Sequence, residues 1–84
     1  MPKPQIDGLL SQLHEKFAAS DTSPQQEMLL QQLQSQLSNW EGPTPPDGSV
    51  VTTAELLLNE LEDKHPQLSQ VLRELMDALG RIGI

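Results

Sequence analysis

A leucine stripe near the C-terminal end restricts the fold of this 84-residue chain more than any other feature. With Leu57 placed at zero and about 100° added per residue, the apolar side chains that follow stay within about 80° of one another. The stripe consists of Leu57, Leu61, Leu68, Leu72, Leu75, Leu79 and Ile82. A stripe with this period predicts α-helix. Its residues form a candidate interaction surface, because so long an apolar face requires a partner.

Pro66 lies within the stripe but does not shift its phase, so two structures fit the pattern. In the first, one helix of about 45 Å runs from Thr53 to Ile82 and bends at Pro66, which points to solvent and removes one hydrogen bond. In the second, the helix ends, and Asp63 or His65 caps a further helix that begins near Pro66. The register of the stripe does not distinguish the kink from the break.

The two structures predict different assemblies. A continuous helix is about twice as long as either N-terminal helix, so one chain cannot cover its apolar face and a homodimer is expected. A broken helix gives four short helices of similar length, which can close a monomeric bundle.

The N-terminal half of the chain predicts two amphipathic helices. Apolar residues from Ile6 to Phe17 share one stripe, and a second stripe begins at Leu29 and ends at Trp40. Between them, Ser23-Pro24 with Gln26 has the pattern of an N-cap, a first helical residue and a capping-box partner. Because the connection is short, the two helices are expected to lie antiparallel as a hairpin.

These segments predict one all-α domain, a small bundle of three to four helices. Residues 1–40 form the helical hairpin, 41–51 a Pro/Gly-rich linker, and 52–84 the C-terminal helical segment. Thr52 and Glu55 have capping-box spacing and are expected to open that segment. At its end, Gly83 is expected as a left-handed residue that lets Ile84 contact Leu79 in a Schellman motif, with Gly80 as the rival end point.

Composition excludes several classes of function. The formal net charge of −7 argues against binding nucleic acid or an anionic membrane surface. The chain has no cysteine, so disulfides, thiolate metal sites and thiol nucleophiles are excluded. No signal peptide and no apolar run long enough to span a membrane is visible, so a soluble, cytoplasmic protein is expected.

Acidic residues are concentrated where the linker meets the C-terminal segment. From Glu41 to Asp63 no Lys or Arg occurs. Such a run usually forms a solvated face that keeps the protein soluble. The alternative is a docking patch for a basic protein, and its candidate residues are Glu55, Glu60, Glu62 and Asp63.

No pattern of a catalytic, cofactor or metal site is present. His14 and His65 belong to no metal-ligand spacing, and surface or capping roles are expected for them. The carboxylates Glu74 and Asp77 are close on a helix, but Arg73 and Arg81 can neutralise them. No nucleophile elbow or phosphate-binding glycine loop occurs. No catalytic residue, cofactor or metal ligand is therefore assigned.

The C-terminal residues resemble a known family. His65-Pro66, Leu68, Leu72, Asp77-Ala78-Leu79-Gly80 and Ile82-Gly83-Ile84 look like the ending of short bacterial proteins grouped as a domain of unknown function, DUF4404. The resemblance implies a leucine-rich helical fold and a bacterial setting. It implies no activity, substrate or catalytic residue.

The pattern therefore favours a non-catalytic protein–protein interaction module that acts by helix–helix association, with itself as a homodimer or with an unknown protein. The alternative is an acidic regulator that binds a basic protein through the acidic run. An enzyme or a metal-binding protein is the remote alternative.

Overall fold

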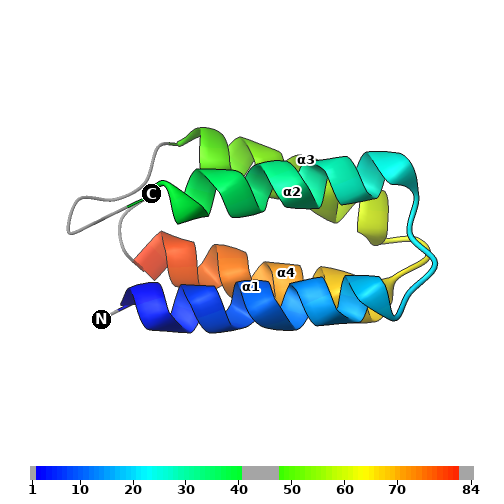
Figure 1. Cartoon of the computed structure of the whole chain (residues 1–84), viewed down its shortest axis with the longest axis horizontal. Helices are drawn as coiled ribbons and strands as arrows, with labels where there is room; N and C mark the ends of the chain where they lie inside the picture. Colours follow the sequence, from blue (N-terminus) through cyan, green and yellow to red (C-terminus); the bar gives the residue numbers. More distant parts are fainter. Residues whose placement is uncertain (1, 41–47, 82–84) are drawn as a thin grey trace.

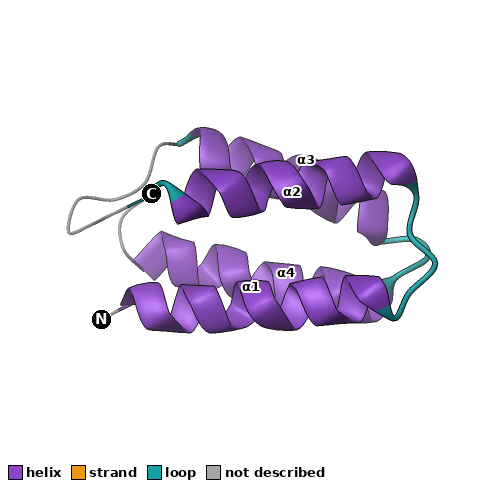
Figure 2. Cartoon of the chain, in the orientation of Figure 1, coloured by secondary structure: helices purple, strands orange, loops and turns teal. Residues whose placement is uncertain are grey.

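The computed structural model describes residues 2–40 and 48–81, with the side chains of residues 2 and 3 excepted. Within these ranges the chain forms four helices that run alternately in opposite directions (Figure 1). They are α1 (Pro2–Ala18), α2 (Pro24–Ser38), α3 (Ser49–Leu61) and α4 (Pro66–Arg81). Between them the described residues form only short loops (Figure 2). The expected all-α bundle is confirmed, and it has four helices.

The helices form two closely packed pairs. Helix α1 packs mainly on α4, and α2 packs mainly on α3. Figure 1 shows the α2–α3 pair lying above the α1–α4 pair. Helices α1 and α2 are antiparallel neighbours, as the hairpin prediction requires, but they pack less closely than the other adjacent pairs. Each N-terminal helix therefore finds its main partner in the C-terminal half of the chain.

The helix is interrupted before Pro66, so the alternative of one continuous, kinked helix is wrong. Helix α3 ends at Leu61, and α4 begins at Pro66 after a short turn. The backbone N–H of His65 donates to the carbonyl of Leu61 at 2.9 Å, and the N–H of Ser69 donates to the carbonyl of His65 at 3.0 Å. His65 thus occupies the N-cap position of α4. Pro66 takes the first helical position, where its missing N–H leaves no bond unmade.

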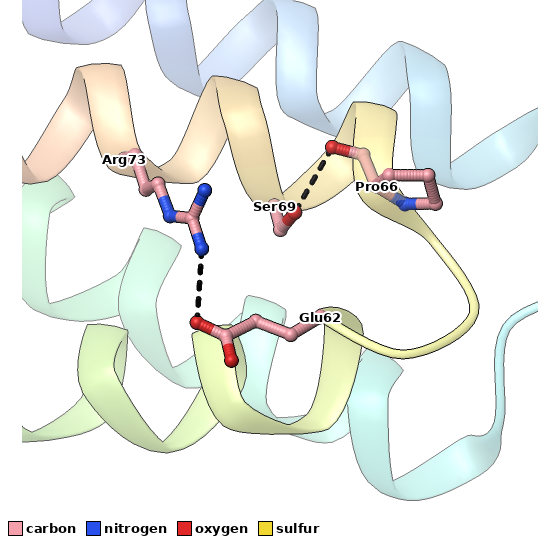
Figure 3. A network of polar contacts seen from close by, with 4 residues as sticks. All are labelled: Glu62, Pro66, Ser69 and Arg73. Atoms are coloured by element: carbon pink, nitrogen blue, oxygen red, sulfur yellow. Dashed lines mark hydrogen bonds and ion pairs between the residues drawn. The ribbon is translucent and has the colours of Figure 1, made fainter.

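Two side-chain contacts hold this turn (Figure 3). The Ser69 hydroxyl donates to the carbonyl of Pro66 at 2.9 Å within the first turn of α4. The guanidinium of Arg73 on α4 lies 3.1 Å from a carboxylate oxygen of Glu62, the residue that follows α3. The ion pair joins the end of α3 to α4 across the bend.

The leucine stripe forms the interior of a single chain. Its described members have at most 2% of their surface exposed: Leu57, Leu61, Leu68, Leu72, Leu75 and Leu79. They share the core with apolar residues of α1 and α2, among them Ile6, Leu13 and Leu33. Ile82 lies outside the described residues. The stripe is therefore not an outward interaction surface in this structure, because the break at Pro66 lets one chain cover it.

The beginning of α2 matches the sequence prediction. Ser23 Oγ accepts a hydrogen bond from the Gln26 backbone N–H at 3.2 Å, and Gln26 Oε1 accepts one from the Ser23 N–H at 2.9 Å. Pro24 is the first residue of the helix. The capping box satisfies two N–H groups that the helix itself leaves unpaired.

The beginning of α3 differs from the prediction. The helix starts at Ser49, inside the segment assigned to the linker, and Thr52 is already within it. The proposed capping box of Thr52 and Glu55 is therefore wrong. Gly48 occupies the N-cap position without a side-chain cap. Val50 is only 1% exposed, and its burial stabilises an additional helical turn before Thr52. The capping pattern does not reveal this turn.

Helix α4 continues through Gly80 to Arg81, so Gly80 is not its end. Arg81 pairs with Asp77 one turn earlier at 3.0 Å. The predicted Schellman contact of Ile84 with Leu79 depends on residues 82–84, which lie outside the described residues.

Candidate protein-docking surface

Two large apolar side chains remain exposed among the described residues. Met28 on α2 has 66% of its surface exposed, and Leu56 on α3 has 52%. Both lie on the helices of one closely packed pair. In the described part of α1 and α4, by contrast, no large hydrophobic side chain is exposed.

Two hydrogen bonds show which residues of α2 lie opposite which residues of α3. Gln26 Nε2 donates to the carbonyl of Glu60 at 3.0 Å near one end, and Gln36 Nε2 donates to Ser49 Oγ at 3.4 Å near the other. Since the helices are antiparallel, the residue opposite Leu56 lies between these two ties, close to Met28. The two exposed apolar residues are therefore at the same level of the pair.

Helical spacing places Leu56 on the side of α3 that borders α2. Ser49, Leu56 and Glu60 are separated by seven and four residues, so they follow one line along the helix. On α2, Leu29 is partly buried against the core and lies next to Met28. We call Met28, Leu29 and Leu56 together the α2–α3 face.

The candidate acidic residues are exposed, but they do not form one patch. Glu60 follows Leu56 on the line that borders α2. Glu55 and Glu62 are seven residues apart and lie on the side of α3 toward α4, where Glu62 pairs with Arg73. Asp63 lies in the turn before α4. Of these carboxylates, Glu60 lies on the same line of α3 as Leu56, and Glu55 precedes Leu56 in the chain.

A polar groove separates α1 from α2. It has a volume of about 540 Å³ and is lined by Asp7, Leu10, Ser11, His14, Glu15, Gln34 and Ser38. His14 Nδ1 and Gln34 Nε2 are 3.2 Å apart across it, so Gln34 donates to the His14 tautomer that carries its proton on Nε2. The groove lies between the two neighbouring helices that pack least closely.

The two histidines are not brought together. His14 also borders a second hollow of about 310 Å³ between α1 and α2. His65 is half-buried in the turn between α3 and α4, beside Lys64 and beside Ser20 of the α1–α2 connection. Within residues 2–40 and 48–81 there is no group of three His, Cys, Asp or Glu residues placed to hold a metal ion. Nor does any helix described here have the length and apolar character required to cross a membrane.

No sequence motif singles out Met28 or Leu56 as surface residues. Leu56 belongs to the run Leu56-Leu57-Leu58, and Met28 directly precedes two leucines, so both resemble core residues by composition. The helical phase could have identified Leu56 as a surface residue, because it lies about 100° from Leu57 and outside the leucine stripe.

A family model described as a domain of unknown function, DUF4404, matches residues 6–84. The match includes most of α1 and all of α2, as well as the C-terminal residues that suggested the resemblance. Searches of curated proteins and of solved structures found no match.

Proposed function

The chain belongs to the DUF4404 family, a domain of unknown function, and because that family brings no activity with it, we propose a function from the molecular surface. The protein is a non-catalytic interaction module that docks a partner protein on the α2–α3 face. The leucine stripe suggested that the partner would bind to the stripe itself. The described stripe residues are buried in the bundle, so the proposed binding surface is a different one.

The observation that carries the proposal is the exposure of Met28 and Leu56 at one level of a single helix pair. Isolated apolar residues on a surface are ordinary. Leu29, which is partly buried, precedes the core residue Leu30 and follows Met28 in the chain, so α2 and α3 together present three apolar side chains that the core does not fully cover. Methionine adapts its shape to different partners and is common at binding surfaces. The α1–α4 pair, with no such exposed residue in its described part, offers an internal comparison.

Site-specific photocrosslinking tests the proposal. A photoreactive amino acid is placed at position 28 or 56, and in matched control proteins at Gln12 of α1 or Gln70 of α4, which are also exposed. Each protein is expressed in its native host, irradiated in cells and analysed by mass spectrometry. We expect covalent adducts with a defined protein from positions 28 and 56, and none from the two control positions.

Adducts that form equally from all four positions would indicate random collision and contradict the proposal. Absence of adducts from every position would also contradict it. The double variant Met28→Gln with Leu56→Gln provides a second check, with the photoreactive group moved to the neighbouring exposed Gln25. Because both replaced side chains are largely exposed, the variant is expected to stay folded and to lose the adduct.

A further inference from the structure

The charge of this protein is divided unevenly between its helices. Helix α1 carries Lys3 and Lys16 with Asp7 and Glu15, and α4 carries two arginines with two carboxylates, so each helix is neutral. The formal charge of −7 therefore lies wholly in residues 19–65, which contain eight acidic residues and a single cation, Lys64. The excess charge belongs to the pair of helices that bears the exposed apolar residues and to its connections.

Helices α2 and α3 contain Glu27, Glu55 and Glu60 and no Lys or Arg. The cations that the structure pairs with carboxylates lie on α4, where Arg73 contacts Glu62 and Arg81 contacts Asp77. Around α3, Glu55 and Glu60 lie on either side of Leu56, Glu55 toward α4 and Glu60 toward α2, and the ion pairs of Arg73 and Arg81 are made with other carboxylates. A partner that covers Leu56 must therefore approach through a negative potential.

From this distribution we infer that the α2–α3 face binds a basic amphipathic helix, with apolar residues on one side and Lys or Arg at the margins. The inference rests on the proposed function and names the chemistry of its partner. Apolar side chains of the partner helix cover Met28, Leu29 and Leu56. Its cations lie beside Glu55 and Glu60, where complementary charge speeds encounter and selects against acidic partners.

A second copy of the same chain does not meet these requirements. Pairing two α2–α3 faces would bring Glu55 and Glu60 of both copies together without an intervening cation from either helix. Like charges placed opposite one another oppose association. The preferred occupant is therefore a basic partner rather than another molecule of this protein.

A defined peptide provides the probe. It has about eighteen residues, enough for about five helical turns, with leucine every three or four positions and lysine elsewhere. A second peptide replaces each lysine by glutamate, and a third keeps the lysines but replaces each leucine by glutamine. Each is titrated into the full ¹⁵N-labelled chain while backbone amide shifts are recorded at low and high salt.

We expect the lysine–leucine peptide to shift amides around Met28 and Leu56, with smaller effects in α1. Raising the salt from about 50 to 500 mM should weaken its affinity at least about tenfold, since screening reduces the attraction between exposed charges. The acidic peptide and the peptide without leucine should bind at least about tenfold more weakly, because each lacks one of the two required features.

Two variants separate the apolar and the charged parts of the face. Met28→Gln with Leu56→Gln leaves the net charge unchanged and should weaken binding about tenfold or more, since buried apolar anchors dominate such contacts. Glu55→Gln with Glu60→Gln keeps the apolar residues and should mainly reduce the dependence of affinity on salt. Their amide spectra, recorded without peptide, verify that both variants are folded.

Equal binding of the basic and acidic peptides would overturn the inference. So would shifts centred on α1 and α4, or no binding of the basic peptide at low salt. If photocrosslinks still formed from positions 28 and 56 in any of these cases, the docking function would stand and only the basic partner would be wrong. If the basic peptide did not bind and positions 28 and 56 gave no photocrosslinks, the docking function would be contradicted as well.

Discussion

Gln26 links local and tertiary structure within one side chain. Its Oε1 accepts from Ser23 N–H in the capping box, while its Nε2 donates to the carbonyl of Glu60 on α3. The side chain is only 9% exposed, so both polar atoms are satisfied inside the protein. The cap is visible in the sequence because its partners are three residues apart. The tie to α3 is not, because it joins residues separated by thirty-four positions.

The variant Gln26→Glu should separate these two roles. Glutamate keeps the acceptor of the capping box but cannot donate to the Glu60 carbonyl when it is ionised. We expect the free energy of unfolding to fall by about 1–3 kcal/mol, because the carbonyl loses its partner and faces a carboxylate. Gln25→Glu makes the same charge change at an exposed neighbouring position and should be neutral or slightly stabilising, since acids favour a helix N-terminus. Equal values from urea unfolding would contradict the role of the tie.

Leu57 and Leu56 provide a matched test of which leucines close the core. Leu57 has 0% of its surface exposed and Leu56 has 52%, although they are adjacent in the chain. Leu57→Ala should lower the free energy of unfolding by about 2–5 kcal/mol, because it removes buried methyl groups and leaves a cavity. Leu56→Ala should cost less than about 1 kcal/mol. A reversed order in urea unfolding would show that α3 is rotated from the described register.

At the scale of elements, the break between α3 and α4 results from both local and distant contacts. Pro66 suits the first position of a helix, and Ser69 completes the first turn. The same residues also permit a bent continuous helix, since proline can be tolerated on a solvent face. The decisive difference is the core: only the broken form brings Leu68 and Leu72 over apolar residues of the same chain.

The variant Pro66→Ala tests whether proline alone enforces the break. We expect α3 and α4 to remain separate, because the buried stripe still favours the closed bundle. The loss of stability should be at most about 1 kcal/mol, arising from the greater freedom of the unfolded chain. Amide shifts for residues 62–65 that become helical, together with a dimeric mass, would show instead that proline alone prevents a continuous helix.

Sequence patterns predicted those elements whose signals are local. The Ser23-Pro24-Gln26 cap placed the beginning of α2 correctly. The beginning of α3 was misplaced, because burial of Val50 outweighed the capping pattern at Thr52. The residues of the proposed docking surface were not predicted either. Its residues become recognisable only when the pairing of α2 with α3 shows that Met28 and Leu56 share one level.

At the scale of the whole molecule, the helices have similar lengths and close a body with extents of 35 × 20 × 18 Å. The leucine stripe is covered inside one chain, and the remaining exposed apolar surface lies on the negatively charged pair. Both features favour a monomer whose exposed apolar surface is available to a different protein. The homodimer was expected for a continuous helix, whereas the structure has the broken form, for which a monomer is expected.

The central claim is that the leucine stripe is the inside of a single-chain bundle, and absolute mass in solution tests it most directly. Light scattering behind a sizing column should give the 9.3 kDa mass of one chain. The mass should stay constant across about 10–500 µM, because an assembly held by self-association would grow with concentration. A constant monomer mass is the predicted result. A dimer throughout this range would contradict the single-chain monomer, because either the stripe or the α2–α3 face would then be shared between chains.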